Sequence, residues 1–209
     1  MARFKKLPIM GILRGVDEDS IIPLMEASGD AGLETVEITM NTANARQLIS
    51  AAVKMSGRRL TIGAGTVLTL DSLKTAIDAG ATFIVMPTII DEVMEYCVRN
   101  VIPVFPGALT PSEIHRAWNA EATMVKVFPS GFFGPKYFKE IKGPFANIEL
   151  LACGGVTAEN ISDYFSNGAS AVAFGASIFK KEWIEKQAFD KISAEIAKLI
   201  RAFRGADSK

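Results

Sequence analysis

Short apolar segments alternate with amphipathic segments along the whole chain, and this alternation restricts the fold more than any other feature. The apolar segments recur at a spacing of roughly 20 to 30 residues, as strand–helix units do. Most are rich in valine, isoleucine and phenylalanine, which is typical of strands covered on both faces. Eight segments are predicted to be strands: Ile9–Leu13, Thr35–Thr39, Thr61–Ala64, Phe83–Met86, Val101–Val104, Met124–Phe128, Glu149–Ala152 and Ala171–Phe174.

The segments between the strands predict helices, and glycines stand where several helices should end, at Gly32, Gly57, Gly80 and Gly168. The predicted helices include Ser20–Ala31, Ala43–Met55, Leu70–Ala79, Ile90–Asn100 and Ser112–Ala120. Eight strands, each followed by a crossover, predict an α/β fold in the form of a (β/α)8 TIM barrel. An open doubly wound sheet would need a nucleotide-binding glycine pattern after its first strand, and residues 11–15, GILRG, are not one.

No linker rich in serine, proline or glycine divides the chain, so we expect a single barrel domain over residues 1–209, with a C-terminal helix at about 183–203. The formal net charge is zero, which argues against binding to nucleic acid. The chain has no apolar run long enough to span a membrane. Its two cysteines, Cys97 and Cys153, form no disulfide framework, and we expect a cytoplasmic protein.

The sequence offers few residues for a metal site or for histidine-based catalysis. His115 is the one histidine, which excludes histidine-rich metal sites and any Ser–His–Asp triad built on another histidine. It follows a polar helix start, TPSEI, and is predicted to be a surface residue. In a TIM barrel, catalytic residues lie at the carboxyl ends of the strands. Polar or backbone-shaping residues follow all eight predicted strands, and this agreement places the candidate site at that end of the barrel.

Lys126 lies in the middle of an apolar strand. An ammonium ion is costly to bury unless it is paired or loses its proton. An unprotonated lysine is a nucleophile that condenses with a ketone to an iminium, which withdraws electrons from the neighbouring carbon and makes carbon–carbon cleavage feasible. We predict that Lys126 is this nucleophile. The alternative is an interior lysine retained as the ion-pair partner of Glu37.

Glu37 is the second unusual residue, because it stands between Val36 and Ile38 in another predicted buried strand. As a general acid and base it would move the protons needed to form the iminium, which is worth about 10²–10⁴-fold in rate. As a structural residue it would only pair with Lys126. The two roles are compatible, since a nearby carboxylate also positions the amine.

Two further groups of residues suggest anion binding. Gly154 and Gly155 follow strand seven, and Ser177 follows strand eight; the loops in these positions form the recurrent phosphate site of such barrels. A plain tight turn is the alternative for the glycine pair. Arg14 and Thr66 are candidates for anion binding on the other side of the rim. Arginine binds carboxylates in bidentate fashion, so Arg14 would hold either a substrate carboxylate or the far end of the substrate. The alternative for Arg14 is a charge on a surface loop.

Seven segments together resemble the class I KDPG/KHG aldolases, which cleave 2-keto-3-deoxy-6-phospho sugar acids. They are GILRG at 11–15, VEITMNT at 36–42, IGAGTVL at 62–68, PGALTPSEI at 106–114, VKVFPS at 125–130, GPKYFKEIKGPF at 134–145 and CGGVTAEN at 153–160. The resemblance spans nearly the whole chain. It implies a TIM barrel that works without metal or other cofactor, commonly as a cytoplasmic homotrimer.

The resemblance also implies roles for individual residues. Lys126 would be the Schiff-base lysine and Glu37 the general acid/base, and Thr66 would bind the pyruvate-derived carboxylate. The remaining implied substrate contacts are the pocket-lining Pro87 and Phe128 and the phosphate-binding Gly154, Gly155 and Ser177.

The sequence departs from the family pattern at two positions. Many gluconate-type members carry an arginine where this chain has Asn41, and a threonine where it has Cys153. Asn41 combined with an arginine in ILRG resembles the branch that acts on the galactonate epimer. Arg14 and Asn41 are both expected to be substrate-binding residues. A cysteine is a weaker hydrogen-bond partner than a threonine.

The predicted function is therefore a lyase that cleaves a 2-keto-3-deoxy-6-phospho-aldonate to pyruvate and glyceraldehyde 3-phosphate. Its expected partners are pyruvate and the phosphorylated keto acid, with no nucleic acid and no membrane. Three alternatives stay open: 4-hydroxy-2-oxoglutarate aldolase activity, a phosphosugar isomerase or epimerase that uses Lys126 and Glu37 without forming an imine, and a non-catalytic phosphosugar-binding protein.

Overall fold

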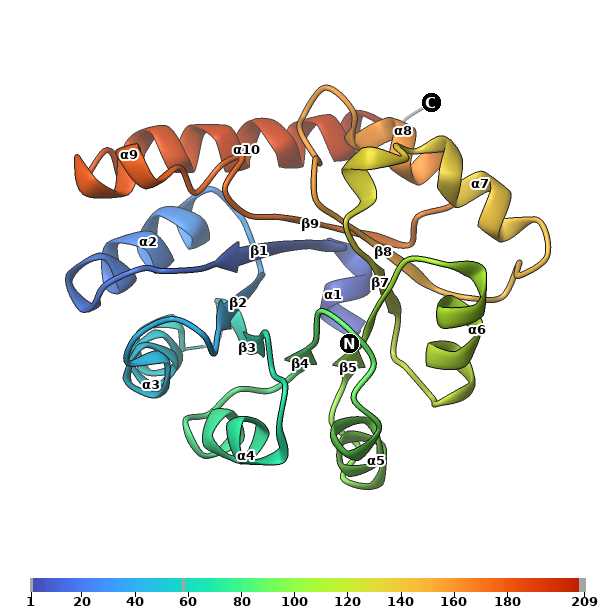
Figure 1. Ribbon diagram of the computed structural model, residues 1–209. Coiled ribbons are helices and arrows are strands. Elements are labelled where there is room, and N and C mark those ends of the chain that lie inside the picture. Colours follow the sequence, from blue (N-terminus) through green and yellow to red (C-terminus); the bar gives the residue numbers. More distant parts are fainter. Residues whose placement is uncertain (1, 58, 207–209) are drawn as a thin grey trace.

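The computed structural model describes residues 2–57 and 59–206, in which a ring of parallel strands is surrounded by helices (Figure 1). The strands are β1 (Ile9–Leu13), β2 (Thr35–Thr39), β3 (Thr61–Gly65), β4 (Ile84–Val85), β5 (Val104–Phe105), β6 (Gly107–Ala108), β7 (Val125–Val127), β8 (Leu150–Cys153) and β9 (Ala171–Phe174). They follow one another in the order β5-β4-β3-β2-β1-β9-β8-β7-β6. β1 pairs with both β2 and β9, so the first strand lies beside the last.

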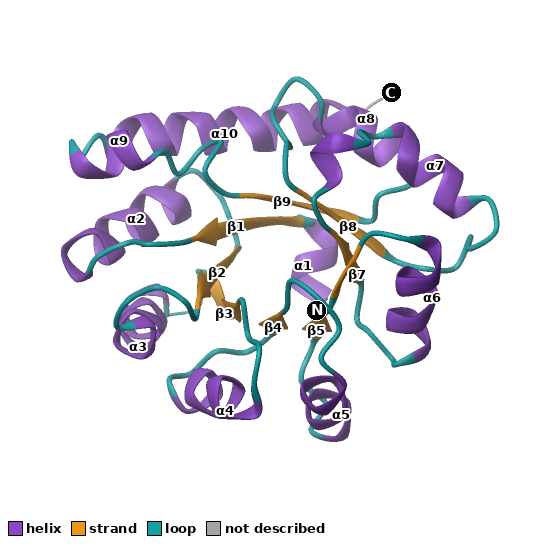
Figure 2. Ribbon diagram, viewed as in Figure 1, coloured by secondary structure: helices purple, strands orange, loops and turns teal. Residues whose placement is uncertain are grey.

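Helices cover the outside of the strand ring, as Figure 2 shows. They are α1 (Ala2–Lys6), α2 (Glu18–Asp30), α3 (Ala45–Ser56), α4 (Leu70–Asp78), α5 (Asp91–Arg99), α6 (Pro111–Asn119), α7 (Lys136–Lys142), α8 (Ile161–Ser166), α9 (Lys181–Glu185) and α10 (Phe189–Ala206), with a 3-10 turn at Ser130–Phe132. α1 differs from the rest because, in this view along the barrel, it falls within the outline of the ring rather than outside it. Within the described part of the chain, no helix has both the length and the apolar character that a membrane span requires.

The fifth barrel strand is split into two short pieces. β5 pairs with β4, and β6 pairs with β7, so the pieces together connect the two ends of the sheet. Pro106 lies between the two pieces and has no N–H group to donate to the sheet. Its carbonyl accepts a hydrogen bond from the N–H of Lys126 (2.9 Å). The predicted (β/α)8 barrel is confirmed, with its fifth strand in two parts.

The predicted position of this strand, Val101–Val104, is wrong. Val101 has a left-handed backbone (φ 57°), and its N–H donates to the carbonyl of Val98, so it belongs to the turn that ends α5. The strand begins only at Val104. Residues 101–104 are all apolar or proline, so their composition does not show where the turn ends and the strand begins. In the structure Val101 is 89% exposed, and the chain enters the barrel core only at Val104, which is 1% exposed.

The C-terminal helix expected at about 183–203 is two helices. α9 ends at Glu185, and α10 begins at Phe189. Gln187 between them adopts a left-handed backbone (φ 51°), and the N–H of Ala188 donates to the carbonyl of Trp183 (2.8 Å), which closes the first helix. The longer α10 packs against α2 and α8.

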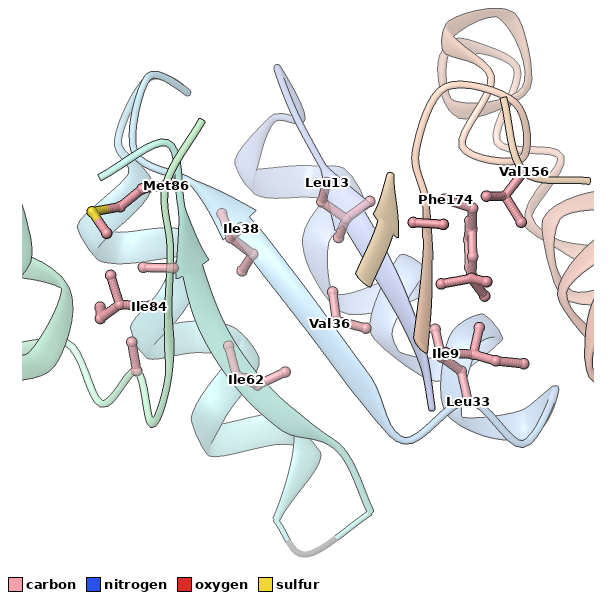
Figure 3. Packing of buried hydrophobic residues seen from close by; sticks show 14 of the residues in the cluster. Ile9, Leu13, Leu33, Val36, Ile38, Ile62, Ile84, Met86, Val156 and Phe174 are labelled. Carbon is pink, nitrogen blue, oxygen red and sulfur yellow. The ribbon is translucent and has the colours of Figure 1, made fainter. Parts of the chain in front are cut away.

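Alternation along the strands separates an outer core from an inner core. Outward-facing residues such as Val36, Ile38 and Ile62 pack against the helices (Figure 3). The inner cluster contains Met10, Phe83, Val85, Phe105, Met124, Leu151, Cys153, Ala171 and Ala173. Glu37 follows Val36, and Lys126 stands between the outward-facing Val125 and Val127, so the same alternation turns both charged side chains into the barrel.

Helix α1 was not predicted, and its Phe4 belongs to the inner cluster of the barrel. The rings of Phe4 and Phe105 pack edge to face with centroids 5.9 Å apart. Phe4 also lines a cavity of about 260 Å³ together with Met10 and Phe83. α1 therefore covers the amino-terminal end of the barrel, opposite the end where the strands finish.

Truncating Phe4 should destabilise the barrel without disturbing its chemistry. Phe4→Ala removes a buried ring and enlarges an existing cavity, and we expect a loss of about 3–5 kcal/mol in the free energy of unfolding, measured by urea denaturation. Lys5→Ala, at an exposed position of the same helix, is the control. A loss for Phe4→Ala no larger than that of the control would contradict the proposed role of α1.

Candidate active site

Lys126 on β7 and Glu37 on β2 meet inside the barrel. Lys126 is 6% exposed and Glu37 1% exposed. Nζ of Lys126 lies 4.0 Å from Oε1 of Glu37, which is an ion-pair distance but too long for a hydrogen bond. The structure thus brings together the two residues that the sequence singled out, from strands on different sides of the ring.

The side chain of Glu37 is buried. Both of its carboxylate oxygens are buried and have no hydrogen-bond partner among the described residues. Burial raises the pKa of Glu37, and the nearby positive charges of Lys126 and Arg14 oppose that shift without cancelling it. A carboxyl group with a raised pKa keeps its proton to a higher pH than an ordinary carboxyl group, so it can donate a proton as well as accept one, which is what acid–base catalysis requires.

Gly65 makes room for this carboxylate. A Cβ atom at Gly65 would stand 2.3 Å from Oε1 of Glu37, a separation that no real contact allows. A side chain is also excluded at Gly63, two residues earlier on β3, where a Cβ atom would stand 2.4 Å from the ring of Phe83. The glycines of the segment IGAGT therefore keep the inner side of β3 flat beside Glu37.

A cavity of about 550 Å³ opens at the carboxyl ends of the strands, a size suited to a small-molecule ligand. Of the predicted site residues, it is lined by Arg14, Thr66, Pro87, Lys126, Phe128, Gly154, Gly155 and Ser177. Glu37 and Asn41 are not part of the lining. Glu37 lies next to Lys126, and Asn41 accepts a hydrogen bond from Arg14.

Arg14 is held by two hydrogen bonds on the rim. Its Nη1 donates to Oδ1 of Asn41 (3.1 Å), and its Nη2 donates to Oγ1 of Thr66 (3.2 Å). Thr66 has a left-handed backbone (φ 54°), which is unusual for a β-branched residue and is frequent at ligand sites. These contacts fix the guanidinium at the cavity wall, where its charge can meet an anionic substrate group.

The glycine pair lies where three loops meet. Gly154 and Gly155 both have positive φ (99° and 77°), and a Cβ at Gly155 would stand 2.9 Å from Cα of Gly131. Ser130 donates its hydroxyl to the carbonyl of Gly154 (2.8 Å). Ser177 donates its hydroxyl to the carbonyl of Val156 at 3.4 Å. The loops after β7, β8 and β9 are thereby joined around one side of the cavity.

Phe128 and Pro87 lie on the cavity wall near Lys126. The Phe128 ring is 42% exposed, and its centroid lies 5.4 Å from Nζ of Lys126, within range of a cation–π contact. An exposed aromatic ring beside a buried lysine gives the cavity an apolar face against which a substrate can pack.

Several lining residues were not predicted as site residues: Ile12, Cys153, Ala173, Phe174, Gly175 and Ala176. Alternation along β1 and β9 could have indicated Ile12 and Ala173, since they follow Met10 and Ala171 on the inner face. Cys153 stands where the sequence departs from the family pattern, and the cavity lining includes it. Its side chain is 3% exposed and lies in the inner core beside the site.

His115 is exposed on α6 and stacks on the ring of Phe145 (centroids 5.3 Å apart), so its predicted surface position is confirmed. Across residues 2–57 and 59–206, no three histidine, cysteine, aspartate or glutamate side chains gather closely enough to hold a metal ion.

Comparison with known proteins agrees with the geometry of this site. The family model of KDPG and KHG aldolase matches residues 1–195. The chain is 34% identical to a 2-dehydro-3-deoxy-6-phosphogalactonate aldolase of Escherichia coli, covering 96% of this chain and 97% of the relative. It is 36% identical to a 2-dehydro-3-deoxy-phosphogluconate aldolase of Pseudomonas aeruginosa, covering 77% and 71%. A solved structure described as native KDPGal superimposes with a TM-score of 0.91 at 34% identity, over 98% of both chains.

The raised pKa of Glu37 predicts a pH dependence of stability. Below the ordinary pKa of 4.5 the carboxyl group is protonated in both folded and unfolded chains; as pH rises, the unfolded chain ionises first, and stability is lost until the folded carboxyl also ionises. Glu37→Gln lacks this loss. Its free energy of unfolding relative to the wild type should therefore rise with pH from about 4.5 upward.

Urea denaturation of both proteins across this pH range measures the effect, with Glu34→Gln, a partly exposed position just before β2, as the matched control. Parallel pH curves for Glu37→Gln and the wild type would contradict the raised pKa. The slope is the readout, because removing the charge of Glu37 also leaves Lys126 without its ion-pair partner.

Proposed function

The chain belongs to the KDPG and KHG aldolase family, and we propose that it is a class I aldolase that cleaves a 2-keto-3-deoxy-6-phospho-aldonate to pyruvate and glyceraldehyde 3-phosphate. Aldolases are carbon–carbon lyases. The observation that carries the proposal is the buried pair of Lys126 and Glu37, with the lysine at the wall of a substrate-sized cavity. This arrangement supplies a nucleophile and a proton-transfer group within reach of the same atom.

In the proposed mechanism, the unprotonated amine of Lys126 attacks the C2 ketone and forms a carbinolamine. Glu37 donates a proton to the departing hydroxyl, which leaves as water, and the iminium results. The C4 hydroxyl then gives its proton to the Glu37 carboxylate as the C3–C4 bond breaks, and the bonding electrons flow into the iminium to give an enamine and an aldehyde. Glu37 returns this proton to C3 of the enamine, and addition of water to the resulting iminium releases pyruvate and restores the amine.

We assign the two ends of the substrate to opposite sides of the rim. Arg14 and Thr66 would bind the keto-acid carboxylate, supported by the two hydrogen bonds that hold the guanidinium toward the cavity. The phosphate would lie against Gly154, Gly155 and Ser177, where glycine allows close approach of the backbone. Pro87 and Phe128 would pack against the carbon chain between these ends.

The galactonate epimer is the substrate that we propose first. The Escherichia coli relative named for that sugar acid matches this chain over nearly its full length, and Asn41 takes part here in holding Arg14. We further propose that the enzyme works in the cytoplasm as a homotrimer and requires no cofactor, as the family resemblance implies.

Trapping the intermediate tests the proposed function. Borohydride with pyruvate should add one reduced three-carbon adduct per chain, located at Lys126 by peptide mapping. Lys126→Arg should abolish both the adduct and cleavage, because guanidinium does not form an imine, whereas Lys142→Arg, outside the cavity, should retain both. Cleavage without any adduct in the wild type would instead indicate a different enzyme class, such as an isomerase or epimerase acting through proton transfer.

The proposed phosphate side of the cavity predicts a selective defect. Gly155→Val places a side chain against Cα of Gly131 and forces a strained backbone, so KM for the phosphorylated keto acid should rise at least tenfold, roughly the scale of one lost charged hydrogen bond. Pyruvate binding, measured by the concentration dependence of adduct formation, should change far less. Equal losses for both ligands would mean general damage to the barrel.

A further inference from the structure

Cys153 lies next to Lys126 on the inner face of the barrel. In the pairing of β7 with β8, Lys126 stands opposite Leu151. Cys153 is two residues beyond Leu151, so it points to the same face, and it is the diagonal neighbour of Lys126. Both side chains line the same cavity and are almost fully buried.

The other neighbours of Lys126 leave a place for a hydrogen-bond partner. Oε1 of Glu37 lies 4.0 Å away, and neither oxygen of this buried carboxylate has a hydrogen-bond partner in the described structure. Phe128 offers only the face of its ring. The amine therefore has the carboxylate of Glu37 on one side, the ring of Phe128 on another, and the sulfur of Cys153 on the neighbouring strand β8.

We propose that Cys153 is the positioning residue for the amine of Lys126: its sulfur accepts a hydrogen bond from Nζ and holds this atom at the cavity wall. This inference rests on the proposed function for its catalytic consequence. Glu37 pairs with Nζ at 4.0 Å without accepting a hydrogen bond from it, and its carboxylate stays available to exchange protons with the bound substrate.

The electrostatic environment keeps this thiol neutral. Burial raises the pKa of Cys153; the nearby Lys126 and Arg14 lower it by less, while Glu37 raises it. A neutral sulfur is a weak acceptor. It can orient the amine without the strong charge–charge attraction by which a second carboxylate would retain the ammonium form.

The first test measures the proximity of the two side chains by a reaction that needs both. o-Phthalaldehyde condenses with a primary amine and a neighbouring thiol to a fluorescent isoindole, with release of two water molecules. The chain has two cysteines, and Cys97 lies in the outer core on α5, away from the cavity. Cys97→Ala is therefore the matched control.

We expect one isoindole per chain in the wild type and in Cys97→Ala, and none in Cys153→Ala or Lys126→Arg. Reduction of the pyruvate adduct beforehand should also abolish the signal. A wild type that gives no isoindole, or a signal that persists in Cys153→Ala, would overturn the proposal. This test does not depend on aldolase activity, so it fails or succeeds separately from the proposed function.

The second test concerns the consequence for imine formation. The plateau rate of imine formation at high pH should fall about three- to tenfold in Cys153→Ala, the scale of one uncharged hydrogen bond. Cys153→Ser should restore the plateau rate, since a hydroxyl also accepts.

Thermal unfolding of both variants separates positioning from packing. A purely structural role would lower stability, and serine would not restore the rate. A Cys153→Ala protein with the plateau rate of the wild type, or a Cys153→Ser protein that behaves like Cys153→Ala, would overturn the positioning role.

Discussion

The placement of a lysine and a glutamate in the buried interior of the barrel is the constraint on which the rest of the site depends. Lys126 and Glu37 lie 4.0 Å apart, and neither oxygen of the carboxylate is satisfied by a hydrogen bond. Buried charges in such an arrangement destabilise the fold relative to apolar residues. The raised pKa of Glu37 expresses this cost, and it is also the property that makes the group useful as an acid and base.

The surrounding elements make this pair possible. The apolar inner layers beneath it, closed at the amino-terminal end by Phe4 of α1, exclude water from one side. Gly65 leaves space for the carboxylate, and the hydrogen bonds of Arg14 to Asn41 and Thr66 fix a positive charge at the rim. The amino-terminal end of the barrel therefore contributes stability, and the carboxyl ends of the strands carry the ligand-binding groups, as is usual in this architecture.

The features that could be predicted are those that neighbouring residues in the sequence determine. Lys126 and Glu37 could be identified because a charge within an apolar strand is visible in the sequence, and the strands β1, β2 and β9 have the predicted bounds. The fifth strand was misplaced because its pieces are two residues long and are defined by pairing with β4 and β7. Likewise, the proximity of Cys153 to Lys126 depends on the register of two strands, and α1 on the packing of Phe4 between distant residues.

A crystal structure of the borohydride-reduced complex with pyruvate tests the central claim most directly. Continuous electron density should join Nζ of Lys126 to C2 of the three-carbon adduct, with the carboxylate of the adduct beside Arg14 and Thr66 and the side chain of Glu37 within hydrogen-bonding distance of the adduct. Density for the adduct on another lysine, or a Glu37 side chain turned away from it, would contradict the account.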